Sequence, residues 1–129
     1  MSPADRRNAQ RIPVCIQSQV AIIHSDRGVR TSVYQGTVTD LSKGGAQVHV
    51  TMTRDNINSL RKDRYFCPIM FENEPELQIG LVGRLVWFHG LDCAQPGLVN
   101  CTLGFRFDHG NEESLDRLEQ FLDRRSDND

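Results

Sequence analysis

The chain has 129 residues, of which 38% are hydrophobic and 25% are charged, so it fits one folded domain with a modest core and not a disordered segment. Its formal net charge of −2 argues against a nucleic-acid binder that works through overall positive charge. The sequence has no apolar leader and no apolar stretch long enough to span a bilayer, so we expect a cytoplasmic protein without membrane insertion.

The charge is distributed unevenly along the chain. Residues 1–11 carry a net charge of +2, from Arg6, Arg7, Arg11 and one aspartate, whereas residues 108–129 carry −5. Residues 1–11 are polar and lack hydrophobic periodicity, so we expect them to form a flexible basic segment. Taken alone, three arginines near a terminus more often belong to a solvated tail than to a site.

Hydrophobic alternation predicts about six strands, because residues two apart share one face of a strand. The strands are expected at residues 12–22, 29–38, 46–50, 66–71, 77–87 and 99–107. Turns are expected at residues 25–28, 40–45 and 72–75, a loop at 90–97, and a short helical turn or a loop at 53–64.

The end of the chain has a different pattern. Asn111 is a suitable helix N-cap, and the apolar residues that follow recur at helical spacing; they are Leu115, Leu118, Phe121 and Leu122. We therefore expect a helix at about 112–125 that packs on the strands. The predicted fold is mainly β: one small antiparallel six-stranded β-barrel over residues 12–125, with a C-terminal α-helix.

A polar group marks the junction after the second strand. Asp40 and Ser42 are two residues apart, so on an extended backbone they point to the same side. Gly44 and Gly45 lack a Cβ and allow positive φ, so the chain can turn sharply there or approach a neighbour closely. Taken alone, Asp-x-Ser before two glycines is more often an ordinary turn between strands.

Two motifs together give a resemblance to a known family. Residues 7–11 (RNAQR) have the form R-x-x-x-R, and residues 40–45 (DLSKGG) have the form D-x-S-x-x-G. The pair resembles the signature of PilZ domains, which are bacterial receptors for cyclic di-GMP. Residues 83–87 (GRLVW) and 103–107 (LGFRF) resemble later PilZ strands. The resemblance covers nearly the whole chain and implies a β-barrel receptor of motility or biofilm regulation.

The resemblance implies a cyclic di-GMP site made by Arg6, Arg7, Arg11, Asp40, Ser42, Gly44, Gly45 and Trp87. An arginine fork matches the N7 and O6 atoms of guanine and also grips phosphate, which are the roles expected of Arg7 and Arg11. The base edge is expected to be held by Asp40 and Ser42. An arginine at position 6 favours a stacked pair of ligand molecules.

One aromatic and one basic side chain in the later strands can each be explained without a role in ligand binding. Trp87 shares parity with Leu81 and Leu85. We therefore expect it at a core position in preference to a contact with guanine. Arg106 has the opposite parity to its phenylalanine neighbours and is expected to be an outward surface charge.

We find no constellation for catalysis or for a metal. The histidines are scattered, Ser42 has no base at catalytic spacing, and the cysteines form no C-x-x-C pair. Cys15, Cys67 and Cys101 lie in strand-like runs and are expected to be small buried hydrophobes in a reduced protein. We therefore expect no enzyme, no metal and no cofactor besides the nucleotide ligand.

The expected function is that of a single-domain receptor, in which cyclic di-GMP orders the basic segment onto the barrel and so changes the surface that an unidentified downstream protein contacts. One alternative is a PilZ-like protein-interaction module that does not bind nucleotide. Another is a barrel that binds RNA or single-stranded DNA by base stacking, which the aromatic content of 7% and the net charge disfavour, so no DNA or RNA partner is expected.

Overall fold

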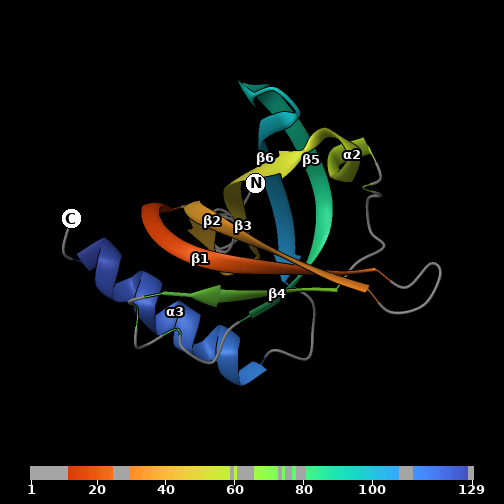
Figure 1. Ribbon diagram of the computed structural model, residues 1–129. Helices are drawn as coiled ribbons and strands as arrows, with labels where there is room; N and C mark the ends of the chain where they lie inside the picture. Colours follow the sequence, from red (N-terminus) through yellow and green to blue (C-terminus); the bar gives the residue numbers. More distant parts are fainter. Residues whose placement is uncertain are drawn as a thin grey trace, which may run out of the picture.

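Six antiparallel strands close into a ring in the order β1-β2-β3-β6-β5-β4 (Figure 1). The computed structural model describes residues 12–24, 30–58, 60, 66–72, 74, 77, 81–107 and 112–127. The strands are β1 (Ile12–His24), β2 (Arg30–Ser42), β3 (Gly45–Thr53), β4 (Phe66–Phe71), β5 (Leu81–Gln95) and β6 (Leu98–Phe107). The described helices are α2 (Arg54–Asn58) and α3 (Glu112–Asp127). The predicted mainly-β fold with a C-terminal helix is confirmed.

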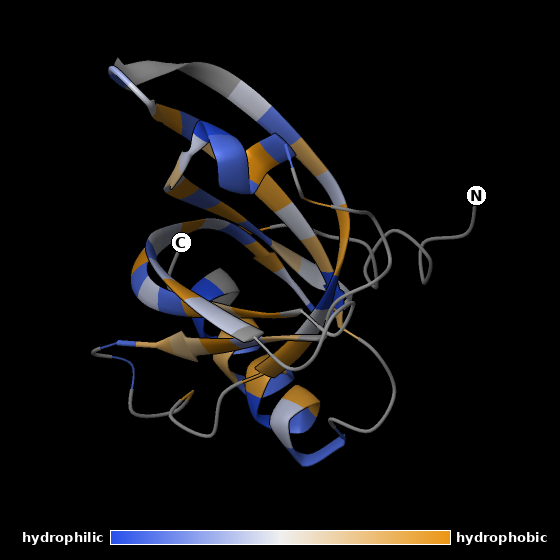
Figure 2. Ribbon diagram, turned by 45° about the vertical axis from the view of Figure 1, so that its right-hand side comes forward, coloured by the Kyte–Doolittle hydropathy of each residue, from blue (hydrophilic) through white to orange (hydrophobic). Residues whose placement is uncertain are grey.

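The ring closes because each strand has one apolar face that must be buried. Hydrophobic and hydrophilic residues alternate along the strands (Figure 2). The inward residues meet in one core, and several of them have no exposed surface, among them Val20, Val38, Val48 and Leu103. Closure also removes the unpaired strand edges that an open sheet would present.

Helix α3 lies outside the ring next to β4 (Figure 1). The predicted apolar stripe packs on the core, because Leu118, Phe121 and Leu122 are all buried and Leu115 is half-buried. The helix ends at Asp127, two residues beyond the predicted end. The expected N-cap, Asn111, lies outside the described residues. No helix in the described part of the chain is long and apolar enough to cross a membrane.

The predicted bounds of the fifth strand are wrong. It begins at Leu81 instead of residue 77, and it continues to Gln95 through the expected loop. Leu77 instead closes a turn, because its N–H donates to the carbonyl of Glu74 over 2.9 Å. Two register shifts, after Gly90 and after Cys93, interrupt the alternation in the stretch where the sequence predicts a loop.

A tight turn at Pro96 and Gly97 joins β5 to β6. Gly97 has a φ of 83°, which only glycine adopts readily. Proline is common at the position before such a residue, because its fixed φ suits the first central position of this turn. The short helical turn expected within residues 53–64 is α2. The hydroxyl of Thr53 accepts a hydrogen bond from the N–H of Asn56 over 3.2 Å and so caps this helix.

Candidate ligand-binding face of the barrel

Asp40 and Ser42 lie on β2 itself and not in a turn as predicted, and both point away from the core. Val38 pairs with Val48 and Leu41 pairs with Ala46, and all four of these residues are buried. A register shift between Val38 and Asp40 inserts Thr39 as an extra residue. This bulge moves Asp40 from the inward parity of Val38 to the outer face, where Ser42 joins it as expected.

The hydroxyl of Ser42 holds the turn that follows β2. Its Oγ accepts hydrogen bonds from the N–H groups of Gly44 and Gly45, both over 3.2 Å, and donates to the carbonyl of Gly45 over 3.3 Å. The N–H of Phe107 donates to the carbonyl of Gly44 over 2.9 Å and ties the turn to β6. Ser42 therefore stabilises the conformation of the turn that follows β2.

The turn requires glycine at Gly45 but not at Gly44. Gly97 is the only glycine with a positive φ among the described residues, so Gly44 and Gly45 do not use the positive φ that glycine allows. The expected close approach is confirmed at Gly45, where a Cβ would overlap the carbonyl oxygen of Phe105. A Cβ on Gly44 would have Ser42 Oγ as its nearest neighbour, 4.0 Å away, so space does not require glycine there.

Trp87 lies on the outer face, and the expected core position is wrong. Between Leu85 and Trp87 the register shifts by one residue, so Leu85 pairs with Phe105 and Trp87 pairs with Gly104. A Cβ on Gly104 would overlap the indole, which shows that the ring lies directly over this glycine. The Trp87 side chain is half-buried and so keeps surface available for a ligand.

Asp40 and Trp87 belong to one row of residues across four strands, which we call the corner row. Its members are paired in sequence across the sheet: Asp40, Gln47, Gly104 and Trp87. Adjacent strands lie about 4.8 Å apart, so the path along the curved sheet between the backbones of the two end residues is about 14 Å. The indole reaches over Gly104 and shortens the gap to Asp40.

A second row beside the corner row supplies positive charge. Ser42 pairs with Gly45, Gly45 with Arg106, and Arg106 with Arg84. Arg106 is exposed, as its parity predicts, but it stands opposite Gly45 of the turn and not at a remote surface position. Lys43 pairs with Glu119 of α3 over 3.2 Å. Strand pairing places Gln47 opposite Asp40 and Arg106 opposite Gly45, and a single sequence does not display this pairing.

The three arginines of the R-x-x-x-R segment, Arg6, Arg7 and Arg11, lie outside the described residues. The described chain begins at Ile12, which pairs with Leu41, and Pro13 pairs with Asp40. The start of β1 therefore lies one strand away from Asp40.

The cysteines do not form a reactive or metal-binding centre in the described part of the chain. Burial raises the pKa of Cys67 to about 12 and that of Cys101 to about 11, so both thiols stay protonated at neutral pH. Cys15 is exposed, because it alternates with the inward Ile16, so the expected burial is wrong for this residue. No group of three or more His, Cys, Asp or Glu side chains gathers among the described residues.

The chain matches the model of a known family. Residues 5–124 match the family model of the PilZ domain. No curated protein matches the chain at a significant level. The matched stretch takes in all six strands of the barrel and most of α3. The chain therefore belongs to the PilZ domain family.

Proposed function

We propose that this protein is a receptor for cyclic di-GMP, the ligand generally bound by PilZ domains, and that it binds the ligand on the corner row together with the arginines of residues 6–11. The observation that carries the proposal is the register of β1 on β2, in which Pro13 pairs with Asp40. Arg11 is bonded directly to Ile12, and the five residue-to-residue steps from Arg7 to Ile12 span at most about 18 Å. Both guanidinium groups are thus within covalent reach of Asp40.

The chemistry of the corner row suits guanine. The Watson–Crick edge of guanine donates hydrogen bonds, which a carboxylate such as Asp40 accepts, while its N7 and O6 atoms accept the two parallel bonds of an arginine fork. The two phosphates of the ligand attract guanidinium groups. The indole of Trp87 offers an apolar surface on which a base can pack.

In the proposed mechanism, the ligand orders the arginine-bearing segment against the barrel beside Asp40. Charge-assisted hydrogen bonds offset the entropy lost by that segment. The new surface changes the contact with a downstream protein. Arg6 is the side chain assigned to a second ligand molecule stacked on the first, in which case two molecules bind per chain.

Isothermal titration with cyclic di-GMP tests this function. We expect saturable binding, weakened about tenfold or more by Arg7→Ala or Arg11→Ala, because each removes a bidentate partner. Arg117→Ala is the matched control, since Arg117 is exposed on α3 and pairs with Glu113. Cyclic di-AMP should not compete, because adenine presents a donor where guanine presents O6. No heat from the unaltered protein at high micromolar ligand would contradict the proposal.

A further inference from the structure

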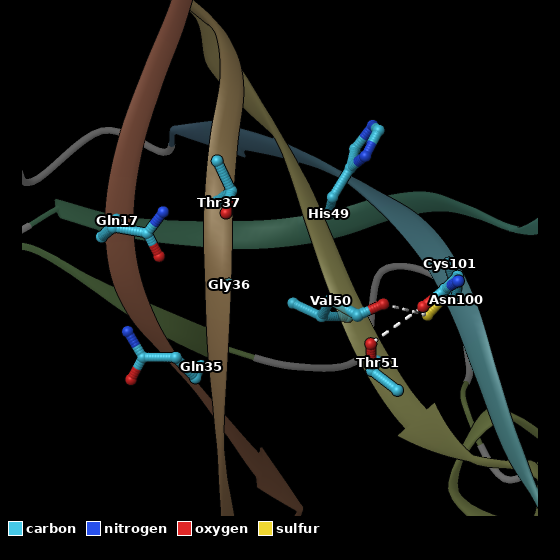
Figure 3. Close-up of a pocket in the computed structure, with 9 residues that line it drawn as sticks. All are labelled: Gln17, Gln35, Gly36, Thr37, His49, Val50, Thr51, Asn100 and Cys101. Carbon is cyan, nitrogen blue, oxygen red and sulfur yellow. Dashed lines mark hydrogen bonds between the residues drawn. The ribbon is translucent and has the colours of Figure 1, made fainter. Parts of the chain in front are cut away.

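A hollow of about 510 Å³ opens on the outer face of the barrel next to the corner row. Its side chains come from four adjacent strands, β1, β2, β3 and β6 (Figure 3). The outward-facing side chains that line it are Gln17, Gln35, Thr37, His49, Thr51 and Asn100. The volume lies within the range of about 300–1,000 Å³ that is usual for small-molecule sites.

Strand register places this hollow in line with Asp40. Gln17 pairs with Thr37, and Thr37 pairs with His49, which forms an outward row parallel to the corner row. His49 is two residues from Gln47 of the corner row, a distance of about 7 Å along the strand. Because of the bulge at Thr39, Asp40 is the next outward residue after Thr37 that pairs with β3. One ligand can therefore lie across both rows.

The lining is polar but carries no formal charge. Among the described residues that line the hollow there is no Lys, Arg, Asp or Glu. Amides, hydroxyls and an imidazole offer both donors and acceptors, which suits the edge of a neutral heterocycle and gives nothing to neutralise a phosphate. The hydroxyl of Thr51 donates to Oδ1 of Asn100 over 2.9 Å and so fixes the orientation of that amide.

A negative charge at the border of the hollow also makes it unsuitable for a phosphate. Nε2 of Gln35 donates to a carboxylate oxygen of Glu72 over 3.2 Å. This carboxylate disfavours a phosphate at that edge. The positive charge of the face is instead beside the turn, where Arg106 stands opposite Gly45. The face thus has a cationic part and a neutral hydrogen-bonding part.

We infer that this hollow takes the second guanine of cyclic di-GMP, while the first guanine and the phosphates lie at the corner row with the arginines. The inference rests on the proposed function. It assigns the two neutral bases of the ligand to different places: one to the carboxylate and arginines of the corner, the other to the amide and hydroxyl groups of Thr37, Thr51 and Asn100.

The test fills the hollow without touching the core. Thr51 and Thr31 are both exposed on outer strand faces, and Thr51 lines the hollow whereas Thr31 does not. Tyrosine is favoured in strands, so both Thr51→Tyr and the control Thr31→Tyr should fold. We expect Thr51→Tyr to weaken cyclic di-GMP binding about tenfold or more and Thr31→Tyr to change it by less than about twofold. Equal affinities of the two variants would overturn the inference.

A second measurement locates the base directly. On addition of cyclic di-GMP to the unaltered protein, the backbone amide resonances of Thr37, His49 and Thr51 should shift together with those of residues 40–47. Shifts confined to residues 40–47 and Trp87 would overturn the inference and leave the proposed function standing. If the unaltered protein does not bind cyclic di-GMP at all, the proposed function fails and the inference fails with it.

Discussion

Gly44 and Gly45 are neighbours in the same turn, yet only Gly45 lies where a side chain has no room. Its Cβ would meet the main-chain carbonyl of Phe105, which the pairing of β3 with β6 holds in place. Gly44 is exposed and its surroundings are open. The closeness of β3 to β6 at this point brings Arg106 beside the turn, so the glycine serves the shape of the site.

The matched pair Gly45→Ala and Gly44→Ala tests this difference. Overpacking against the main chain should lower the free energy of unfolding of Gly45→Ala by about 2–4 kcal/mol, whereas Gly44→Ala should change it by less than about 1 kcal/mol. Urea denaturation of both variants measures the two values. Equal stabilities would show that the approach to Phe105 is not restrictive.

At single residues, the sequence indicates the face of a side chain only where alternation is unbroken. Asp40 and Ser42 are expected on one side, and they lie there, because no bulge separates them. Trp87 is expected in the core by its parity with Leu85, and the register shift between them reverses that parity. A one-residue insertion leaves no trace in composition, and it moves every following side chain to the other face.

At the scale of elements, α3 is held on the barrel by its apolar face. Leu118 has no exposed surface, whereas the ion pair between Lys43 and Glu119 joins side chains that are each nearly half exposed. An exposed pair of this kind contributes at most about 1 kcal/mol. The neighbouring positions 118 and 119 therefore separate the two kinds of contact on one helix.

Leu118→Ala should lower the free energy of unfolding by about 2–5 kcal/mol, because it leaves a cavity in the core. Glu119→Ala, which removes only the ion pair with Lys43, should lower it by less than about 1 kcal/mol. Chemical denaturation followed by circular dichroism gives both values. A Glu119→Ala loss as large as that of Leu118→Ala would mean that charge, and not apolar packing, holds α3.

Strands and helix are predictable where hydrophobic period alone decides the element. The period-two runs of β1, β3 and β6, and the helical stripe of α3, are located from the sequence. The ends of β2 and β5 are not, because the bulge at Thr39 and the two shifts near Gly90 and Cys93 break the alternation. The sequence signal for the real turn between β5 and β6 is the Pro96-Gly97 pair.

At the scale of the whole molecule, strand pairing around the ring assembles the candidate site from segments far apart in sequence. The register of β1 on β2 sets the start of the described chain beside Asp40, and the order β2-β3-β6-β5 carries the same row to Trp87. The family resemblance indicates the motif residues, but their common row depends on strand pairing over distances that a single sequence does not encode locally. The hollow, which is lined by β1, β2, β3 and β6, depends on the pairing of these strands.

Trp87 is the only tryptophan of the chain, so its fluorescence reports on the corner row alone. Cyclic di-GMP should change this emission in a saturable way, with the same midpoint as the heat of binding, because a guanine bound at the corner row packs near the indole. Cyclic di-AMP should leave the emission unchanged. Saturable heat from cyclic di-GMP with no change in the emission of Trp87 would contradict binding on this face.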